Sequence, residues 1–165
     1  MSGKEGEDDK GNGEAANMPT KNNGGFIDSY EDFYNFMVKE ANTEKVEVTA
    51  LAIKTSQDGN IIYYVEPWKN NTSTDAVSNL NSAPGYSSKD VIAQYHTHIN
   101  SAYPSPQDAF FSNEFSIPVR PIGADGRVWE VNIPQPYIVP VLKLRLGNEQ
   151  SSYPLNPGQL IYNPN

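Results

Sequence analysis

Hydrophobic positions near the start of the chain recur at the spacing of a helix. Aromatic and apolar side chains between Tyr30 and Ala41 lie three or four residues apart, which places them on one helix face. Asp28 is followed three residues later by Glu31, an interval typical of a capping box. The pattern predicts an amphipathic helix over roughly 29–41 whose aromatic face is part of the core.

The pattern then changes to one typical of β-strands. Residues 46–54 and 60–66 are rich in β-branched and aromatic side chains and flank the turn signal Asp58-Gly59, so they predict a hairpin. Residues 91–98 predict a further strand.

Shorter elements are expected in the second half of the chain. A helix start at Ser105 predicts a short helix to about residue 112, residues 117–122 and 127–132 predict a second hairpin, and residues 137–146 predict a last strand. We expect an α+β fold, a mixed β-sheet flanked by short helices.

The amino-acid composition changes along the 165 residues, and these changes predict one domain with a leader and a tail. Residues 1–25 hold six of the 12 glycines and no aromatic residue, so we expect a disordered acidic leader. The domain is expected over 26–146, and residues 147–165 are expected to form an extended tail. The polar segment 67–90 is unusually long for a loop and is expected to be either mobile or functional.

Charge and composition exclude several function classes. The formal net charge is −8 and the 12 basic residues form no cluster, so nucleic acid is a poor partner. The chain has no cysteine, which excludes thiolate nucleophiles and Cys-ligated zinc. No apolar stretch is long enough to span a membrane. We expect a soluble protein, either cytoplasmic or exported as part of a larger precursor, and the sequence leaves its oligomeric state open.

Candidate chemistry gathers around the two histidines of the chain. His96 and His98 are two residues apart on a predicted strand, so both imidazoles face the same side. Asp108 lies three residues after Ser105, the predicted N-cap, so its carboxylate is expected in the first helical turn. Two imidazoles and a carboxylate are a ligand set that suits Zn²⁺, and a turn of six residues could bring them together.

This run of His-x-His, a short gap and Ser-x-x-Asp resembles the metal-binding signature of the JAB/MPN (JAMM) metalloproteases, of the bacterial JAB-like type. The resemblance implies a cytidine-deaminase-like fold in which His96, His98 and Asp108 bind zinc. It also implies that Ser105 assists the oxyanion and that a glutamate on an earlier strand is the general base. Glu47 is the candidate for that glutamate, with Glu44 and Glu66 as rivals. The implied activity is hydrolysis of a peptide or isopeptide bond in a peptide or protein substrate.

Two other interpretations stay open. A JAB-like domain without catalysis would be a binding or scaffolding module, with segment 67–90 as its contact region. The domain could also be the terminal part of a larger secreted or surface protein or toxin, which would determine its location and not its chemistry.

Overall fold

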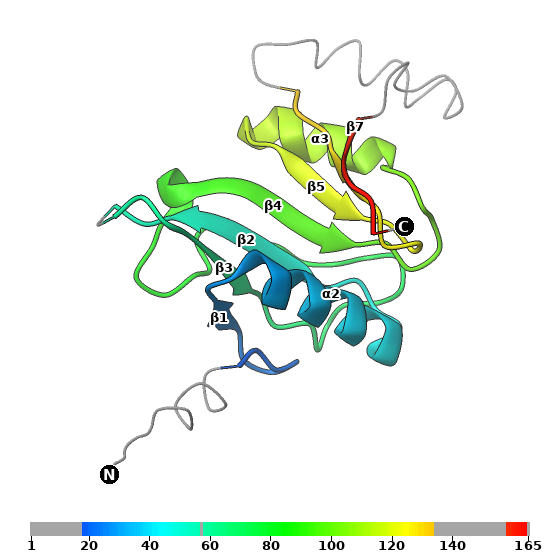
Figure 1. The fold of residues 1–165 in the computed structure, drawn as a ribbon, viewed down its shortest axis with the longest axis horizontal. Helices are drawn as coiled ribbons and strands as arrows, with labels where there is room; N and C mark the ends of the chain where they lie inside the picture. The colour runs from blue at the N-terminus through cyan, green and yellow to red at the C-terminus, as the bar shows by residue number, and fades with distance from the viewer. Residues whose placement is uncertain (1–17, 57, 134–157, 165) are drawn as a thin grey trace.

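A mixed β-sheet with helices on its two faces forms the structure, a computed structural model that describes residues 18–56, 58–133 and 158–164. These residues contain a seven-stranded sheet and two α-helices, which confirms the α+β class (Figure 1). In chain order the elements are β1 (Gly25–Ile27), α2 (Tyr30–Glu44), β2 (Thr49–Lys54), β3 (Ile61–Val65), the 3₁₀ turn η1 (Ser88–Asp90), β4 (Val91–Thr97), α3 (Pro106–Phe115), β5 (Val119–Ile122), β6 (Val128–Glu130) and β7 (Gln159–Tyr162).

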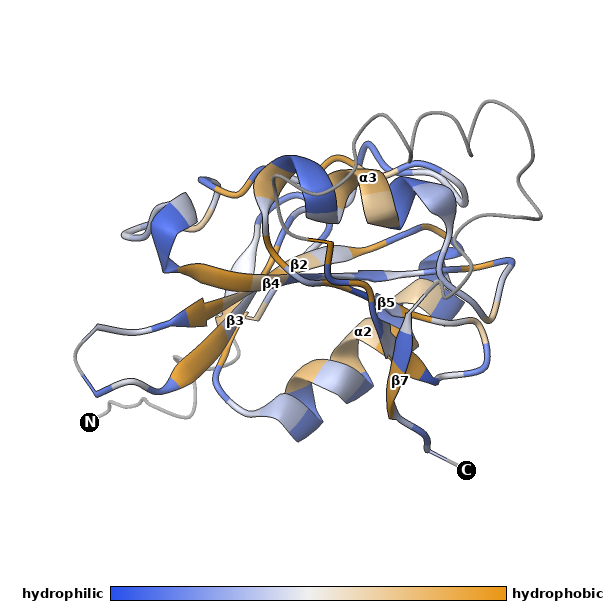
Figure 2. Cartoon of the chain, turned by 90° about the horizontal axis from the view of Figure 1, so that it is seen from above, coloured by the Kyte–Doolittle hydropathy of each residue, from blue (hydrophilic) through white to orange (hydrophobic). Residues whose placement is uncertain are grey.

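The strands are arranged in the order β1-β3-β2-β4-β5-β6-β7. Among the described strands, β4 and β5 are the one pair that is parallel, and α3 makes the crossover between them, as a parallel connection requires. The centre of the sheet is the antiparallel pair β2 and β4, in which Thr49 lies opposite His96. Helix α2 covers one face of the sheet and α3 covers the other (Figure 2).

Helix α2 forms where the spacing predicted it, with a different cap. Its N-cap is Ser29, whose hydroxyl accepts a hydrogen bond from the backbone N–H of Asp32, so the prediction that Asp28 begins the capping box was wrong by one residue. Its buried face packs on the sheet, and the Phe33 ring stacks on Tyr63 at 4.3 Å between centroids.

The long polar segment 67–90 is ordered against the face that α3 covers. Leu80 and Ala83 are buried there in a cluster with Leu51 and Ile53 of β2. The hairpin β2–β3 and the hairpin β5–β6 are both present as predicted.

The folded region extends beyond the boundaries expected from composition. The carbonyl of Lys21 accepts hydrogen bonds from the backbone N–H groups of Trp68 and Lys69, so residues before 26 are part of the fold. At the other end, β7 is extended as expected of the tail, and it pairs with β6 in the sheet. The predicted strand 137–146 lies outside the described residues. Within the described ranges, no helix has the length and apolar character needed to cross a membrane.

Candidate metal centre

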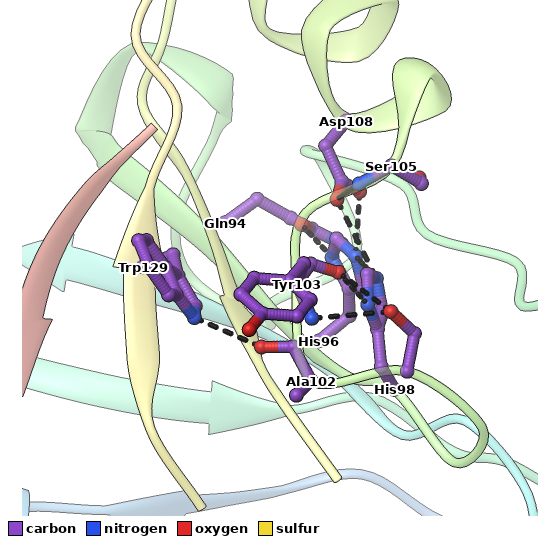
Figure 3. Close-up of polar contacts among 9 residues, drawn as sticks. Gln94, His96, His98, Ala102, Tyr103, Ser105, Asp108 and Trp129 are labelled. Carbon is purple, nitrogen blue, oxygen red and sulfur yellow. Dashed lines mark hydrogen bonds and ion pairs between the residues drawn. The ribbon is translucent and has the colours of Figure 1, made fainter. Parts of the chain in front are cut away.

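The end of strand β4 places both histidines on one face of the sheet. His96 and His98 project toward α3, while the hydroxyl of Thr97 between them accepts a hydrogen bond from the backbone N–H of Val48. His96 and His98, taken as whole residues, are each less than one tenth exposed. The alternation predicted from the sequence therefore brings the two rings side by side (Figure 3).

The start of helix α3 supplies the carboxylate. Ser105 is the N-cap and Pro106 the first helical residue, as predicted. The backbone N–H of Ser105 donates to Asp108 Oδ2 at 2.8 Å, which fixes the Asp108 side chain in the first turn. Asp108 is 4 % exposed. A capping interaction therefore holds Asp108 in place, and the same carboxylate is part of the candidate site.

Three potential ligand residues converge in this place. His96 Nε2 lies 2.7 Å from Asp108 Oδ1 and 3.1 Å from His98 Nε2, and His98 Nε2 lies 3.4 Å from Asp108 Oδ2. The ligand atoms of His96, His98 and Asp108 all lie within 4.8 Å of one another, so this cluster could hold a metal ion.

The contact that each ring makes through Nδ1 determines which of its nitrogens faces the Asp108 carboxylate. His98 Nδ1 lies 2.8 Å from the backbone carbonyl of Tyr103, and His96 Nδ1 lies 2.9 Å from Gln94 Oε1. A carbonyl oxygen only accepts, so both Nδ1 atoms carry hydrogen, and the two Nε2 atoms face each other and Asp108. Two Nε2 atoms and a carboxylate at these distances need a proton or a metal cation between them. Histidines that bind metals are usually oriented by such an outer hydrogen bond, so the donor set fits a metal ion.

The loop between the second histidine and α3 is held from outside the site. Trp129 Nε1 of β6 donates to the carbonyl of Ala102 at 2.9 Å. Gly123 lies against the same carbonyl, where a Cβ atom would come within 2.6 Å of the oxygen. These contacts fix the loop and with it the Tyr103 carbonyl that orients His98.

Charge in the cluster favours an ionised Asp108. Burial alone raises the pKa of its carboxyl, but the charges and hydrogen bonds of His96 and His98 outweigh burial and hold that pKa well below its usual range. Burial lowers the pKa of His98, whereas the hydrogen bond and charge of Asp108 raise it, and the net pKa is raised. Asp108 is therefore a carboxylate at neutral pH, as a metal ligand must be.

Of the three candidate glutamates, Glu47 is the one that lines the site. It lies two residues before Thr49, the first residue of β2, and is half-buried beside His96 and Asp108. Burial raises the pKa of Glu47, opposed by His96 and His98 and reinforced by Asp108 and Asp75. Glu44 is exposed at the end of α2, on the other face of the sheet.

Glu66 is buried, and hydrogen bonds to its carboxylate hold the polar segment 67–90. Its carboxylate accepts hydrogen bonds from the Thr49 hydroxyl, the Ser78 hydroxyl, the Asn79 backbone N–H and the Ser82 hydroxyl, at 2.6–2.8 Å. Those contacts exclude it as a free base.

A cleft of about 600 Å³ opens beside the cluster, between segment 74–78 and α3. Glu47, His96 and Asp108 lie along it, whereas Ser105 is not among its lining residues. Ser105 contacts the site through its backbone N–H, which donates to Asp108 Oδ2.

The sequence patterns did not reveal the roles of three further residues in this arrangement. Gln94 precedes His96 by two residues on the same strand face, so its position was foreseeable, although its role was not. The Tyr103 carbonyl and Asp75 reach the site through loop conformations that no local pattern reveals.

No family model, curated protein or solved structure matches the chain.

Proposed function

We propose that this protein is a zinc-dependent metallopeptidase or isopeptidase with a JAB/MPN-like fold. The observation that carries the proposal is the convergence of two oriented imidazoles and an ionised carboxylate at the edge of a cleft that also contains a half-buried glutamate. The helix, hairpin and parallel β4-α3-β5 unit are compatible with that fold.

His96, His98 and Asp108 would hold the ion through Nε2, Nε2 and the carboxylate. Bound zinc lowers the pKa of a coordinated water to about 7 and polarises a substrate carbonyl. Three protein ligands are the number typical of catalytic zinc sites, in contrast to the four of structural sites.

Glu47 is proposed as the general base. Its position on the cleft wall lets it take a proton from the attacking water and return it to the leaving amine. The raised pKa of its carboxyl, caused chiefly by burial, makes it a better proton acceptor than an exposed glutamate. Ser105 is proposed to assist the oxyanion, supported by its place at the N-cap next to Asp108.

The first test is zinc content after dialysis against metal-free buffer, for wild type and His98→Ala. About one zinc per chain is expected in the wild type and none in the variant, because two remaining ligands bind weakly. Failure of the wild type to retain zinc, even after zinc is added back, would overturn the proposal.

The second test is cleavage of a complex peptide mixture and of isopeptide-linked substrates, followed by mass spectrometry. Glu47→Gln should keep zinc and lose about 10²–10⁴-fold in cleavage rate, since it removes the proton acceptor only. Glu44→Gln makes the same chemical change on the other face and should cleave like the wild type. Full zinc content without cleavage in the wild type would instead favour a non-catalytic binding module.

A further inference from the structure

The cleft beside the metal cluster has walls from two parts of the chain. Segment 74–78, which includes Asp75 and Val77, forms one wall, and α3 forms the other with Phe110, Phe111 and Glu114. The first wall is fixed to the sheet, because the Val77 carbonyl lies 3.3 Å from the Thr49 hydroxyl and its N–H donates to Asn71 Oδ1. The cleft is therefore a built surface of the folded chain.

The charge of the cleft is of one sign. Glu47, Asp75, Asp108 and Glu114 all line it, and none of its described lining residues is lysine or arginine. Asp75 is near enough to Glu47 for its charge to raise the pKa of that carboxyl. Carboxylates along a concave surface with protein walls concentrate negative potential, which attracts cations. Bound zinc would offset the charge of Asp108, whereas Asp75 and Glu114 lie on the two walls of the cleft.

Apolar side chains accompany these carboxylates. Val77 is 69 % exposed. Phe111 and Phe115 of α3 contact each other with ring centroids 4.7 Å apart, and Phe115 is 45 % exposed. Val77 and Phe111 line the cleft together with its carboxylates, a combination that matches a side chain with an alkyl stem and a cationic end.

We propose that the cleft binds a peptide segment carrying lysine or arginine next to the hydrolysed bond. The cationic group is directed to Asp75 and Glu114, and the alkyl stem lies along Val77 and Phe111. This assignment of substrate class rests on the proposed function, since it describes what the same site would bind.

The test is equilibrium binding of three fluorescein-labelled heptapeptides to the full chain by fluorescence polarisation. The peptides differ only at the central residue, which is lysine, norleucine or glutamate, so the first pair isolates the ammonium group. Mass spectrometry after the measurement checks that the peptides are intact. Parallel measurements use Asp75→Asn, Glu114→Gln and the control Glu44→Gln, which removes the same charge from the opposite face.

The lysine peptide is expected to bind about tenfold more tightly than the norleucine peptide at low salt, which corresponds to about 1.4 kcal/mol. Asp75→Asn and Glu114→Gln should each reduce that preference about threefold, and Glu44→Gln should leave it unchanged. Equal binding of all three peptides, or an equal loss in Glu44→Gln, would overturn the inference. The zinc measurement is separate: lysine preference without zinc would refute the hydrolase alone, and zinc with cleavage but no preference would refute the inference alone.

Discussion

At the residue scale, the centre depends on which nitrogen of each imidazole carries hydrogen. Gln94 Oε1 and the Tyr103 carbonyl each accept from an Nδ1–H, which leaves both Nε2 atoms to face Asp108. Asp108 in turn is held by the Ser105 backbone N–H. Each ligand therefore has one partner outside the cluster, and loss of a partner should be visible as loss of metal affinity.

Replacing Gln94 by leucine tests this orientation directly. Gln94→Leu keeps the side-chain volume and removes the acceptor for His96 Nδ1, so zinc affinity should fall about 10- to 100-fold. A competition titration against a zinc chelator measures the change. Gln159→Leu, on the exposed strand β7, serves as the control and should bind zinc like the wild type. Unchanged affinity in Gln94→Leu would show that the ring needs no such partner.

At the element scale, the segment between β3 and β4 behaves as part of the fold. Glu66, at the end of β3, gathers four hydrogen bonds from Thr49 and residues 78–82. Asn71 Nδ2 donates to the Glu47 carbonyl, and the Glu47 N–H donates to the Thr72 carbonyl. The same segment thus positions the backbone of the proposed base and one wall of the cleft.

Substitution of Glu66 should weaken the whole domain. Glu66→Leu leaves three hydroxyls, including that of the buried Thr49, and a backbone N–H without this acceptor, and we expect the free energy of unfolding to fall by about 2–4 kcal/mol. Urea denaturation followed by circular dichroism measures it. Glu44→Leu, at an exposed helix position, should change stability by less than about 0.5 kcal/mol. A loss for Glu66→Leu as small as that of the control would show that the segment is held by other contacts.

Local patterns were sufficient for α2, α3 and strands β2 to β6, and for most of the centre. Period-3.6 and period-2 spacing predicted α2 and β4, and the cap at Ser105 placed Asp108, because these are interactions within a few residues. What remained hidden depends on distant partners. Residues 18–25 are ordered by Trp68 and β3, and Gln159–Tyr162 form a strand only because β6 offers an edge. Glu66 was a rival candidate for the base because its hydrogen-bond partners are 12 to 17 residues away in sequence, where a local pattern does not reveal them.

At the scale of the whole molecule, the hydrophobic core and the candidate centre are separate. One cluster lies between α2 and the sheet and includes Phe33, Met37 and Tyr95, and a second surrounds Leu51 and Ile53. Neither contains His96, His98 or Asp108, so the fold does not need a metal for its main support.

Removal of the metal should therefore leave the domain folded. After treatment with EDTA, the far- and near-ultraviolet circular dichroism should be retained. The Tm should fall by an amount on the order of 10 °C, because the metal binds only the native state and its removal takes away that stabilisation. Unfolding in EDTA at room temperature would mean a structural zinc. His98→Ala should show the same Tm with and without EDTA.

The two imidazoles of the centre are also the complete histidine complement of the chain. In a long-range ¹H–¹⁵N correlation spectrum, every imidazole resonance therefore belongs to His96 or His98. The tautomer that Gln94 and Tyr103 impose can be read directly as two protonated Nδ1 signals. With no cysteine to compete, cobalt substituted into the protein would likewise have an absorption spectrum free of thiolate bands. The centre can thus be followed in the intact protein without labels at chosen sites.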